Sequence, residues 1–450
     1  MIPFAVHSYQ NRSLPVSAQR CVNFYPEVQP EGARSKVVLH GTPGLELFAT
    51  CGSSNVTGLY TFQDTLYAVS DGTLYSIDSS GTATSIGSVG TGRVSIADNG
   101  TQMVIVNGIN GYVYDGTTLS QITDSAFYPS ATVAFQDGYF IFERKDTGQF
   151  FISAINDGTD FDGLDYATAE SAPDDTLAVW SDHRELWLFG EQTIEVWFNS
   201  GDADFPFERN NGAMIERGLG ATHSVAQLDN TLCWLGDDLI VYRANGYTPT
   251  RISQFGVEAA ISGYSTTSDA FAYTYADSGH TFYVLTFPTE SKTWVYDAST
   301  GLWHERSYWD AAEYRHRSNC YVKCYGKHFV GDFENGNIYE MSLDTYSDNS
   351  DEIRRQANSS HIHNDGERMF HSRIEIFMES GVGLLGEDDP QAMLKWSNDG
   401  GKTWGNEHWK SMGAIGEYGK RIVWNRLGSF RQRVYSLVVS DPVKTVTIGA

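Results

Sequence analysis

Short strand-like runs that recur at a regular spacing constrain this chain more than any other feature of its sequence. From about residue 56 to about residue 345, apolar and polar residues alternate in short runs, and Asp-Gly, Asn-Gly and Ser-Gly turns separate the runs. Alternation with a period of two places successive side chains on opposite faces of a strand, and such turns connect antiparallel strands. This region is therefore expected to be a succession of small antiparallel sheets.

The runs fall into sets of three or four, and the sets begin about every 36 to 48 residues, near positions 57, 93, 132, 176, 222, 269 and 317. A repeat of about 40 to 50 residues with three or four strands is typical of a β-propeller, in which neighbouring sheets bury each other's faces around an axis. We therefore predict an all-β fold with a β-propeller of six or seven blades over residues 56–349. A large β-sandwich, or two β domains with coincidental spacing, is the alternative.

The segments that flank the repeat have a different character. Residues 1–55 contain five of the 12 prolines, and proline cannot donate a hydrogen bond to a sheet. We expect an extended N-terminal arm rather than a sheet, anchored on its own domain or on a neighbour. Residues 350–450 contain longer runs at wider spacing, which predict a separate C-terminal β-sandwich-like domain.

The charge balance excludes several classes of function. The chain has 56 acidic and 31 basic residues, which give a formal net charge of −25. Tight binding to DNA or to an anionic membrane requires clustered Lys and Arg, so we expect neither. No apolar run approaches the roughly 20 residues that span a bilayer, and the N-terminus does not resemble a signal peptide. Five scattered cysteines do not suggest a disulfide framework and fit synthesis in a reducing cytoplasm.

The sharpest local motif is SNDGGKTW at residues 397–404. It resembles the Asp box, S-x-D-x-G-x-T-W, of sialidases and many other β-rich proteins, and its motif positions are Ser397, Asp399, Gly401, Thr403 and Trp404. The aspartate of such a turn can accept backbone N–H bonds, while glycine adopts a positive φ easily. In sialidases the box lies away from the catalytic centre, so we predict a structural β-hairpin without a catalytic role.

Three groups of residues could suggest a metal site, but their spacing argues against one. The first is an acidic loop that fails the EF-hand pattern of a calcium site: Asp157, Asp160, Asp162 and Asp165. The second recurs every four residues, which on a strand spans about 13 Å and is too far for one ion: His316, Cys320, Cys324 and His328. The third, His361 and His363, has no evident third ligand. We predict no metal and no cofactor.

The sequence offers no local signature of an enzyme. It contains no G-x-S-x-G, H-E-x-x-H or P-loop motif, so we predict no catalytic residues. Its C-terminal part is locally basic, with five cations within fourteen residues: Lys420, Arg421, Arg426, Arg431 and Arg433. A solvated strand face is the simplest interpretation, and a surface that docks an acidic partner is the alternative.

Motif blocks along nearly the whole chain suggest a family when they are taken in order. They are NFYPE and HGTPGL at 23–27 and 40–45, AESAPDD and ERGLGA at 169–175 and 216–221, and SNDGGKTW followed by KRIVWNRLGSFRQR within 397–443. This combination resembles the packaged-DNA stabilisation proteins of short-tailed phages, the tail nozzle or tail accessory factor family of podophages. Residues 240–345 agree with the family only in their alternating pattern.

The resemblance implies a structural protein of the virion tail, made in the host cytoplasm. Family members form a ring, expected to contain six copies, below the head-to-tail adaptor ring; they retain packaged DNA and act as the conduit for its ejection. A tail needle, plug or tailspike below the ring is a candidate further partner. The acidic charge agrees with this role, because a channel wall that repels phosphate lets DNA pass without tight binding.

Two other functions remain open at the level of sequence. The Asp box and the aromatic content, 13% of the chain, would also suit a β-propeller glycoside hydrolase of the sialidase type. Such enzymes usually carry several Asp boxes and an arginine cluster, whereas this chain carries one box. A carbohydrate-binding or receptor-binding tail protein is the third possibility.

Overall fold

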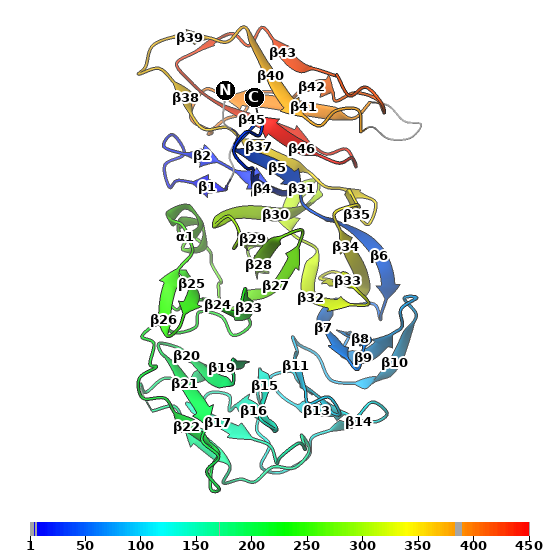
Figure 1. The fold of residues 1–450 in the computed structure, drawn as a ribbon, viewed down its shortest axis with the longest axis vertical. Helices are drawn as coiled ribbons and strands as arrows, with labels where there is room; N and C mark the ends of the chain where they lie inside the picture. The colour runs from blue at the N-terminus through cyan, green and yellow to red at the C-terminus, as the bar shows by residue number, and fades with distance from the viewer. Residues whose placement is uncertain (1–3, 5–6, 171, 383–388, 450) are drawn as a thin grey trace.

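The computed structural model describes residue 4 and residues 7–170, 172–382 and 389–449 of the chain. Ser171, which belongs to the AESAPDD block, lies outside the described residues. Within the described part the fold is almost entirely β, and its one helix is the short α1 (Phe255–Ile261). Figure 1 shows the propeller at one end of the molecule and the C-terminal strands at the other.

Six antiparallel units of the propeller hold their four strands in sequence order. The inner strands begin within four residues of the positions at which the sequence pattern starts each set. The strands are β7 (Val56–Phe62), β8 (Thr65–Ser70), β9 (Thr73–Ile77) and β10 (Ala83–Ser88); β11 (Ser95–Asp98), β12 (Met103–Val106), β13 (Gly111–Tyr114) and β14 (Leu119–Gln121); β15 (Val133–Gln136), β16 (Tyr139–Glu143), β17 (Gln149–Ile152) and β18 (Tyr166–Thr168); β19 (Thr176–Asp182), β20 (Glu185–Gly190), β21 (Ile194–Asn199) and β22 (Phe207–Arg209); β23 (Ala226–Leu228), β24 (Thr231–Leu235), β25 (Val241–Asn245) and β26 (Thr248–Arg251); and β27 (Phe271–Asp277), β28 (His280–Phe287), β29 (Lys292–Asp297) and β30 (Leu302–Asp310).

A further unit takes its outer strand from the N-terminal arm. It consists of β32 (Ser318–Cys324), β33 (Lys327–Asp332), β34 (Asn337–Ser342) and β6 (Gly44–Thr50). β6 pairs antiparallel with β34, from Thr50 opposite Asn337 to Gly44 opposite Ser342. Residues that precede the first unit therefore complete the last one, which closes the ring and covers a sheet edge that would otherwise be open.

Side-chain hydrogen bonds also join the inner strands of neighbouring units, all the way round the ring. From β7 onward they run as follows: Tyr60 to Asp98 at 2.7 Å, Val133 N–H to Ser95 at 3.2 Å, Ser181 to Gln136 at 2.8 Å, Gln227 to Asp182 at 3.2 Å, Thr274 to the Gln227 carbonyl at 2.6 Å, Tyr273 with Ser318 at 2.8 Å, and Asn319 to the Val56 carbonyl at 2.7 Å. The belt bridges every junction between inner strands and ties the units together around the axis.

The C-terminal domain is a sandwich of two sheets with an apolar core between them. One sheet has the order β4 (Phe24–Val28), β5 (Val37–Gly41), β46 (Val446–Gly449), β40 (Arg373–Met378) and β43 (Ile422–Asn425). The other has the order β3 (Cys21–Val22), β37 (Arg355–Asn358), β45 (Gln432–Val439), β41 (Gln391–Ser397) and β42 (His408–Ser411). The predicted β-propeller and β-sandwich are thus both present.

Short strands complete the structure. They are β1 (Tyr9–Gln10), β2 (Ala18–Gln19), β31 (Ala312–Arg315), β35 (Ser347–Asp348), β36 (Asp351–Glu352), β38 (Ile362–His363), β39 (Met369–Phe370) and β44 (Ser429–Phe430). β35 lies parallel to β6, and β38 pairs with β45. The division of the chain at residues 55 and 349 stays a prediction.

The expectation that proline keeps the arm out of sheets is wrong. Pro26 lies in β4, opposite Leu39 of β5, in a hairpin that belongs to the C-terminal sandwich. β4 is the edge strand of its sheet, and an edge position tolerates proline because one side of the strand needs no donor. Phe24 and Leu39 of this hairpin are buried in the sandwich core.

The closing strand offers a direct test of ring closure by matched substitutions. Leu45 is 1% exposed, whereas Leu47, on the same strand, is 48% exposed. We expect Leu45→Ala to lower the free energy of unfolding by about 2–5 kcal/mol, because it leaves a cavity between β6 and the core. Leu47→Ala should stay within about 0.5 kcal/mol of the parent. Urea denaturation followed by tryptophan fluorescence measures both, and equal losses for the two variants would contradict the packing described here.

Candidate functional site

One strand of the arm joins the propeller to the C-terminal sandwich. β3 pairs in parallel with β30 of the propeller, where Val22 lies opposite Glu305. On its other side β3 pairs antiparallel with β37, where Cys21 lies opposite Ala357. A single hydrogen-bonded sheet therefore runs from β27 through β30, β3 and β37 to β42. Figure 1 shows β4, β5 and β37 at this boundary.

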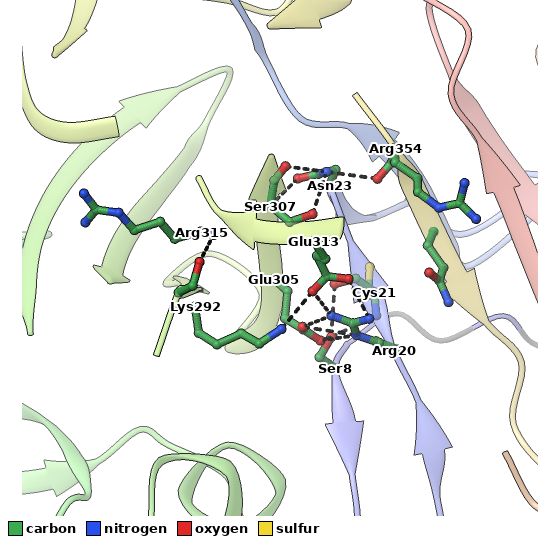
Figure 2. Close-up of polar contacts among 12 residues, drawn as sticks. Ser8, Arg20, Cys21, Asn23, Lys292, Glu305, Ser307, Glu313, Arg315 and Arg354 are labelled. Carbon is green, nitrogen blue, oxygen red and sulfur yellow. Dashed lines mark hydrogen bonds and ion pairs between the residues drawn. The ribbon is translucent and has the colours of Figure 1, made fainter. Parts of the chain in front are cut away.

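A network of ion pairs fixes the arm beside this strand. Arg20 lies between Glu305 and Glu313 (Figure 2). Its Nε donates to both Glu305 carboxylate oxygens at 3.0 and 3.1 Å, and its Nη1 donates to Glu313 Oε2 at 2.9 Å. Lys292 Nζ donates to Glu313 Oε1 at 3.0 Å. Burial alone would raise the pKa of Glu313, but the charges of Arg20 and Lys292 lower this pKa to about 2.

Asn23 connects three segments through a single side chain. It is 1% exposed, and its amide Nδ2 donates to the carbonyls of Ser307 and Arg354 at 2.9 Å each. Its Oδ1 accepts the Ser307 N–H at 2.9 Å. Asn23 has φ of +53°, a conformation that asparagine tolerates better than most residues. The arm, β30 and the segment before β37 are therefore held at one point, and Figure 2 shows these contacts.

We define the junction cluster as the residues of Figure 2 that contact the arm at this boundary: Ser8, Arg20, Cys21, Asn23, Glu305, Ser307 and Glu313. Within it, Ser8 Oγ accepts the Cys21 N–H at 2.8 Å and lies 2.9 Å from Glu305 Oε1. No local motif identifies this cluster, because its partners lie nearly 300 residues apart in the sequence, as with Asn23 and Ser307 at a separation of 284. Its arrangement suits a rigid connection between domains rather than chemistry on a substrate.

The Asp-box residues come together in one turn between β41 and β42. Ser397 Oγ donates to Asp399 Oδ1 at 2.6 Å, and Asp399 accepts the N–H groups of Lys402 and Thr403 at 3.0 and 2.9 Å. Thr403 Oγ1 donates to Asp399 Oδ2 at 2.5 Å. The hydrogen bond from Ser397 and those from Thr403 hold the pKa of Asp399 well below its usual range. The carboxylate is thus engaged by its own turn.

The same turn packs against the N-terminal arm. Gly400 and Gly401 have φ of +79° and +94°. A Cβ atom on Gly400 would lie 2.8 Å from Pro15 Cα, and one on Gly401 would lie 2.7 Å from Ala18 Cβ. Glycine is therefore required here both by the backbone conformation and by the close approach of the arm. Trp404 is half-buried, and Lys395 Nζ lies 6.0 Å from the centre of its ring. The structural role of the box stays a prediction.

The basic residues of the C-terminal part do not form one solvent-facing strip. Arg433 is 2% exposed, donates to Asn398 and to the Leu427 carbonyl at 2.8 and 2.7 Å, and stacks on Phe430. Arg433 therefore belongs neither to a solvated strand face nor to a docking surface, because it lies in β45, where every residue after Gln432 is buried. Of the others, Arg421 binds Glu375, Lys420 binds Glu417, Arg431 donates to the Gly366 carbonyl, and Arg426 is exposed. Their role in docking remains a proposal.

A second cluster, which the sequence did not reveal, lies at the axis of the propeller. Arg93, just before β11, donates to the carbonyl and to the side chain of Asn319 on β32 at 3.1 and 3.0 Å. Its guanidinium lies 3.8 Å from the ring centre of Phe271, which begins β27. The Arg93 side chain therefore reaches from the start of β11 to β32 and β27, which are not the inner strands next to β11. It crosses the mouth of the propeller axis at this level.

Several of the residues considered as metal ligands are engaged by neighbouring groups. Asp157 accepts the N–H and the hydroxyl of Thr159 at 2.9 and 2.7 Å, and His328 Nδ1 lies 2.9 Å from the Tyr321 hydroxyl. Among the described residues, no group of three or more His, Cys, Asp or Glu side chains is placed to hold a metal ion. In the same part of the chain, no helix has the length and apolar character needed to cross a membrane.

Two family models match the chain one after the other. The model described as bacteriophage P22 Gp10, beta-propeller, matches residues 2–346, and the model described as bacteriophage P22 Gp10, beta-sandwich, matches residues 354–449. No curated protein sequence matches the chain.

Solved structures with a similar arrangement share little sequence with this chain. BamB from Moraxella catarrhalis is 9% identical, with a TM-score of 0.42, and the match covers 72% of this chain and 98% of that one. The Pan2 WD40 domain of Neurospora crassa is 8% identical, with a TM-score of 0.44, and the match covers 67% of this chain and 96% of that one.

The Asp-box turn can be tested through its backbone amides. Asp399→Ala removes the acceptor of the Lys402 and Thr403 N–H groups, so we expect both amides to exchange with deuterium faster than in the parent. Lys402→Ala is the matched control, because it changes the same turn but keeps both hydrogen bonds. Hydrogen-exchange mass spectrometry of the peptide that contains 398–407 measures the difference, and unchanged exchange in Asp399→Ala would refute the role of its carboxylate.

The junction cluster predicts a loss of stability that depends on pH. Arg20→Ala leaves Glu305, which is 7% exposed, without its cation, and we expect a loss of about 3 kcal/mol. Arg12→Ala, at an exposed arginine of the same arm, is the control and should change little.

Because the folded-state pKa of Glu313 is lowered to about 2 from 4.5, its contribution is complete above pH 4.5 and is lost as the pH falls toward 2. Urea unfolding between pH 7 and pH 3 should show this decline in the parent and a smaller decline in Arg20→Ala. Parallel curves for the two proteins would contradict the pairing.

Proposed function

Because this chain belongs to the bacteriophage P22 Gp10 family of tail nozzle and DNA-stabilisation proteins, we propose that it forms the nozzle ring of a short phage tail. The observation that carries the proposal is the pair of family matches, which together span the propeller and the sandwich. In this proposal, six copies form the ring below the head-to-tail adaptor, retain the packaged DNA and provide its path at ejection. The family is one of structural proteins, and no catalytic role is proposed.

We place the DNA path between the copies and not through a single propeller. Arg93, Phe271 and Asn319 occupy the mouth of the propeller axis, where Arg93 contacts both of the other residues. A duplex would have to displace these side chains and the belt of inner-strand hydrogen bonds in order to enter. A path lined by the outer surfaces of several copies requires no such change.

The charge of the chain supports passage without tight binding. Each copy carries a formal net charge of −25, and six copies carry six times that value. Surfaces of this sign repel the phosphate backbone and make few of the cation contacts that give nucleic-acid binding its affinity. The copies also repel one another, so their association in a ring depends on contacts that outweigh this repulsion.

The junction between the two domains fits a part that bears load. The sheet that passes through β3 connects the propeller and the sandwich, and the ion pairs of Arg20 with Glu305 and Glu313 hold the arm to the propeller side of this boundary. Shear across such a sheet is resisted by several hydrogen bonds at once. The Asp box, by contrast, gives no support to a glycoside hydrolase, since Asp399 is bound within its own turn.

The proposal is tested by locating the protein in the virion. We expect mass spectrometry and cryo-EM of the purified phage to place the chain in the tail, in a six-fold ring next to the adaptor. The isolated protein should assemble on the purified adaptor ring in native mass spectrometry, and should leave duplex DNA unshifted in an electrophoretic assay at low salt. Absence from the tail, or a monomer that never joins the adaptor, would rule out the nozzle.

A further inference from the structure

Two arginines from different parts of the propeller lie side by side at the mouth of its axis. Arg93 and Arg315 both donate through Nη2 to the same atom, Asn319 Oδ1, at 3.0 and 3.3 Å. The two Nη2 atoms are therefore no more than 6.3 Å apart, the sum of these two lengths. Both guanidinium groups also approach the Phe271 ring, at 3.8 and 5.7 Å from its centre. Figure 2 shows Arg315 pointing away from the junction cluster, on the side opposite Arg20.

No carboxylate neutralises this pair. Among the described residues, neither Arg93 nor Arg315 forms an ion pair with a carboxylate. Three acidic groups act on Arg315 from farther away, and each has another partner, although the buried Oδ1 of Asp269 has none among the described residues. Asp332 and Glu334 lie 3.2 and 3.5 Å from Arg317 Nη1, and Asp269 Oδ2 accepts the Thr289 N–H at 2.8 Å. In a chain with 56 acidic residues, an arginine pair without a carboxylate is unexpected.

Arg315 is also withdrawn from solvent, and Arg93 is partly so. Arg315 is 7% exposed, and its buried Nη1 has no hydrogen-bond partner among the described residues. Burial lowers the pKa of Arg93 to about 10, and burial together with the charge of Arg93 lowers the pKa of Arg315 to about 10. A buried donor that carries a charge destabilises the fold unless an acceptor satisfies it. These features point to an acceptor that is negatively charged and is not part of this chain.

We propose that Arg93 and Arg315 together bind one small oxyanion of the phosphate or sulfate class at the mouth of the propeller axis. Planar guanidinium groups donate in pairs to the oxygens of such anions, and the bonds are strengthened by charge. Arg93 is half-buried and follows the exposed Thr91 and Gly92, so the anion can enter from this side. Once bound, it links the loop before β11 to the end of β31 across the axis.

The test uses the purified full-length protein and inorganic phosphate. At constant pH and ionic strength, replacing chloride by phosphate should raise the melting temperature, because a ligand that binds the folded state alone stabilises it. Isothermal titration calorimetry should give one site per chain. Arg315→Gln should weaken that binding at least ten-fold, since it removes charged donors. Arg184→Gln is the matched control, because Arg184 is 83% exposed and pairs with Asp137. This variant should bind phosphate as tightly as the parent does.

A bridging water molecule is the other way to satisfy the buried donor of Arg315, and it predicts the opposite results. A water molecule that bridges Arg315 Nη1 and the buried Asp269 Oδ1 would also satisfy both atoms. In that case the melting temperature would be the same in phosphate and chloride, calorimetry would show no binding, and the proposal would be overturned. If Arg315→Gln does not fold, Arg93→Gln and the line width of the phosphate signal in ³¹P NMR with the parent protein decide the question. Binding that both glutamine variants retain at full strength would likewise refute the site.

Discussion

The pairing of sheet edges by the N-terminal arm is the interaction on which the rest of the structure depends. A propeller unit with three strands leaves an open edge, and a sandwich that ends beside a propeller leaves another. β6 covers the first edge by pairing with β34, and β3 covers the second by lying between β30 and β37. The β4–β5 hairpin then supplies two strands of the sandwich and part of its core. Without these strands, the ring and the contact between the two domains would both be incomplete.

Charged side chains inside the molecule serve this same architecture. Arg20 stabilises the domain boundary through two glutamates, and Arg433 is enclosed by aromatic rings within the sandwich. Arg317 binds Asp332 of the propeller and Asp351 of β36 and so connects the last propeller unit to the following segment. Arg20 and Arg317 are thus matched by carboxylates, whereas Arg433 is held by neutral acceptors and by aromatic rings.

The sequence predicts those parts of the fold that are recorded locally and misses those that depend on distant partners. Alternating residues and glycine turns place the inner strands well, since a hairpin and its turn lie within a few residues of each other. Pro26 gives a wrong prediction because a sheet tolerates it only at the edge position of β4, which is defined by strands some 400 residues later. The run of basic residues predicts an exposed Arg433, but both faces of β45 are buried there, and Arg93 gives no local signal because Asn319 and Phe271 are far away in sequence.

The position of β6 in the ring has a consequence for the order of events during biosynthesis. Its partner strand ends at Ser342, and the strand that flanks β5 in the sandwich begins only at Val446. The ribosome therefore releases β5 and β6 long before β46 and β34 exist, although β4 and β5 can already pair with each other. The open edges of these strands must be satisfied by water until their later partners have emerged. A nascent chain that ends before Asn337 leaves the ring open, and one that ends before Val446 leaves β5 without its second neighbour in the sandwich.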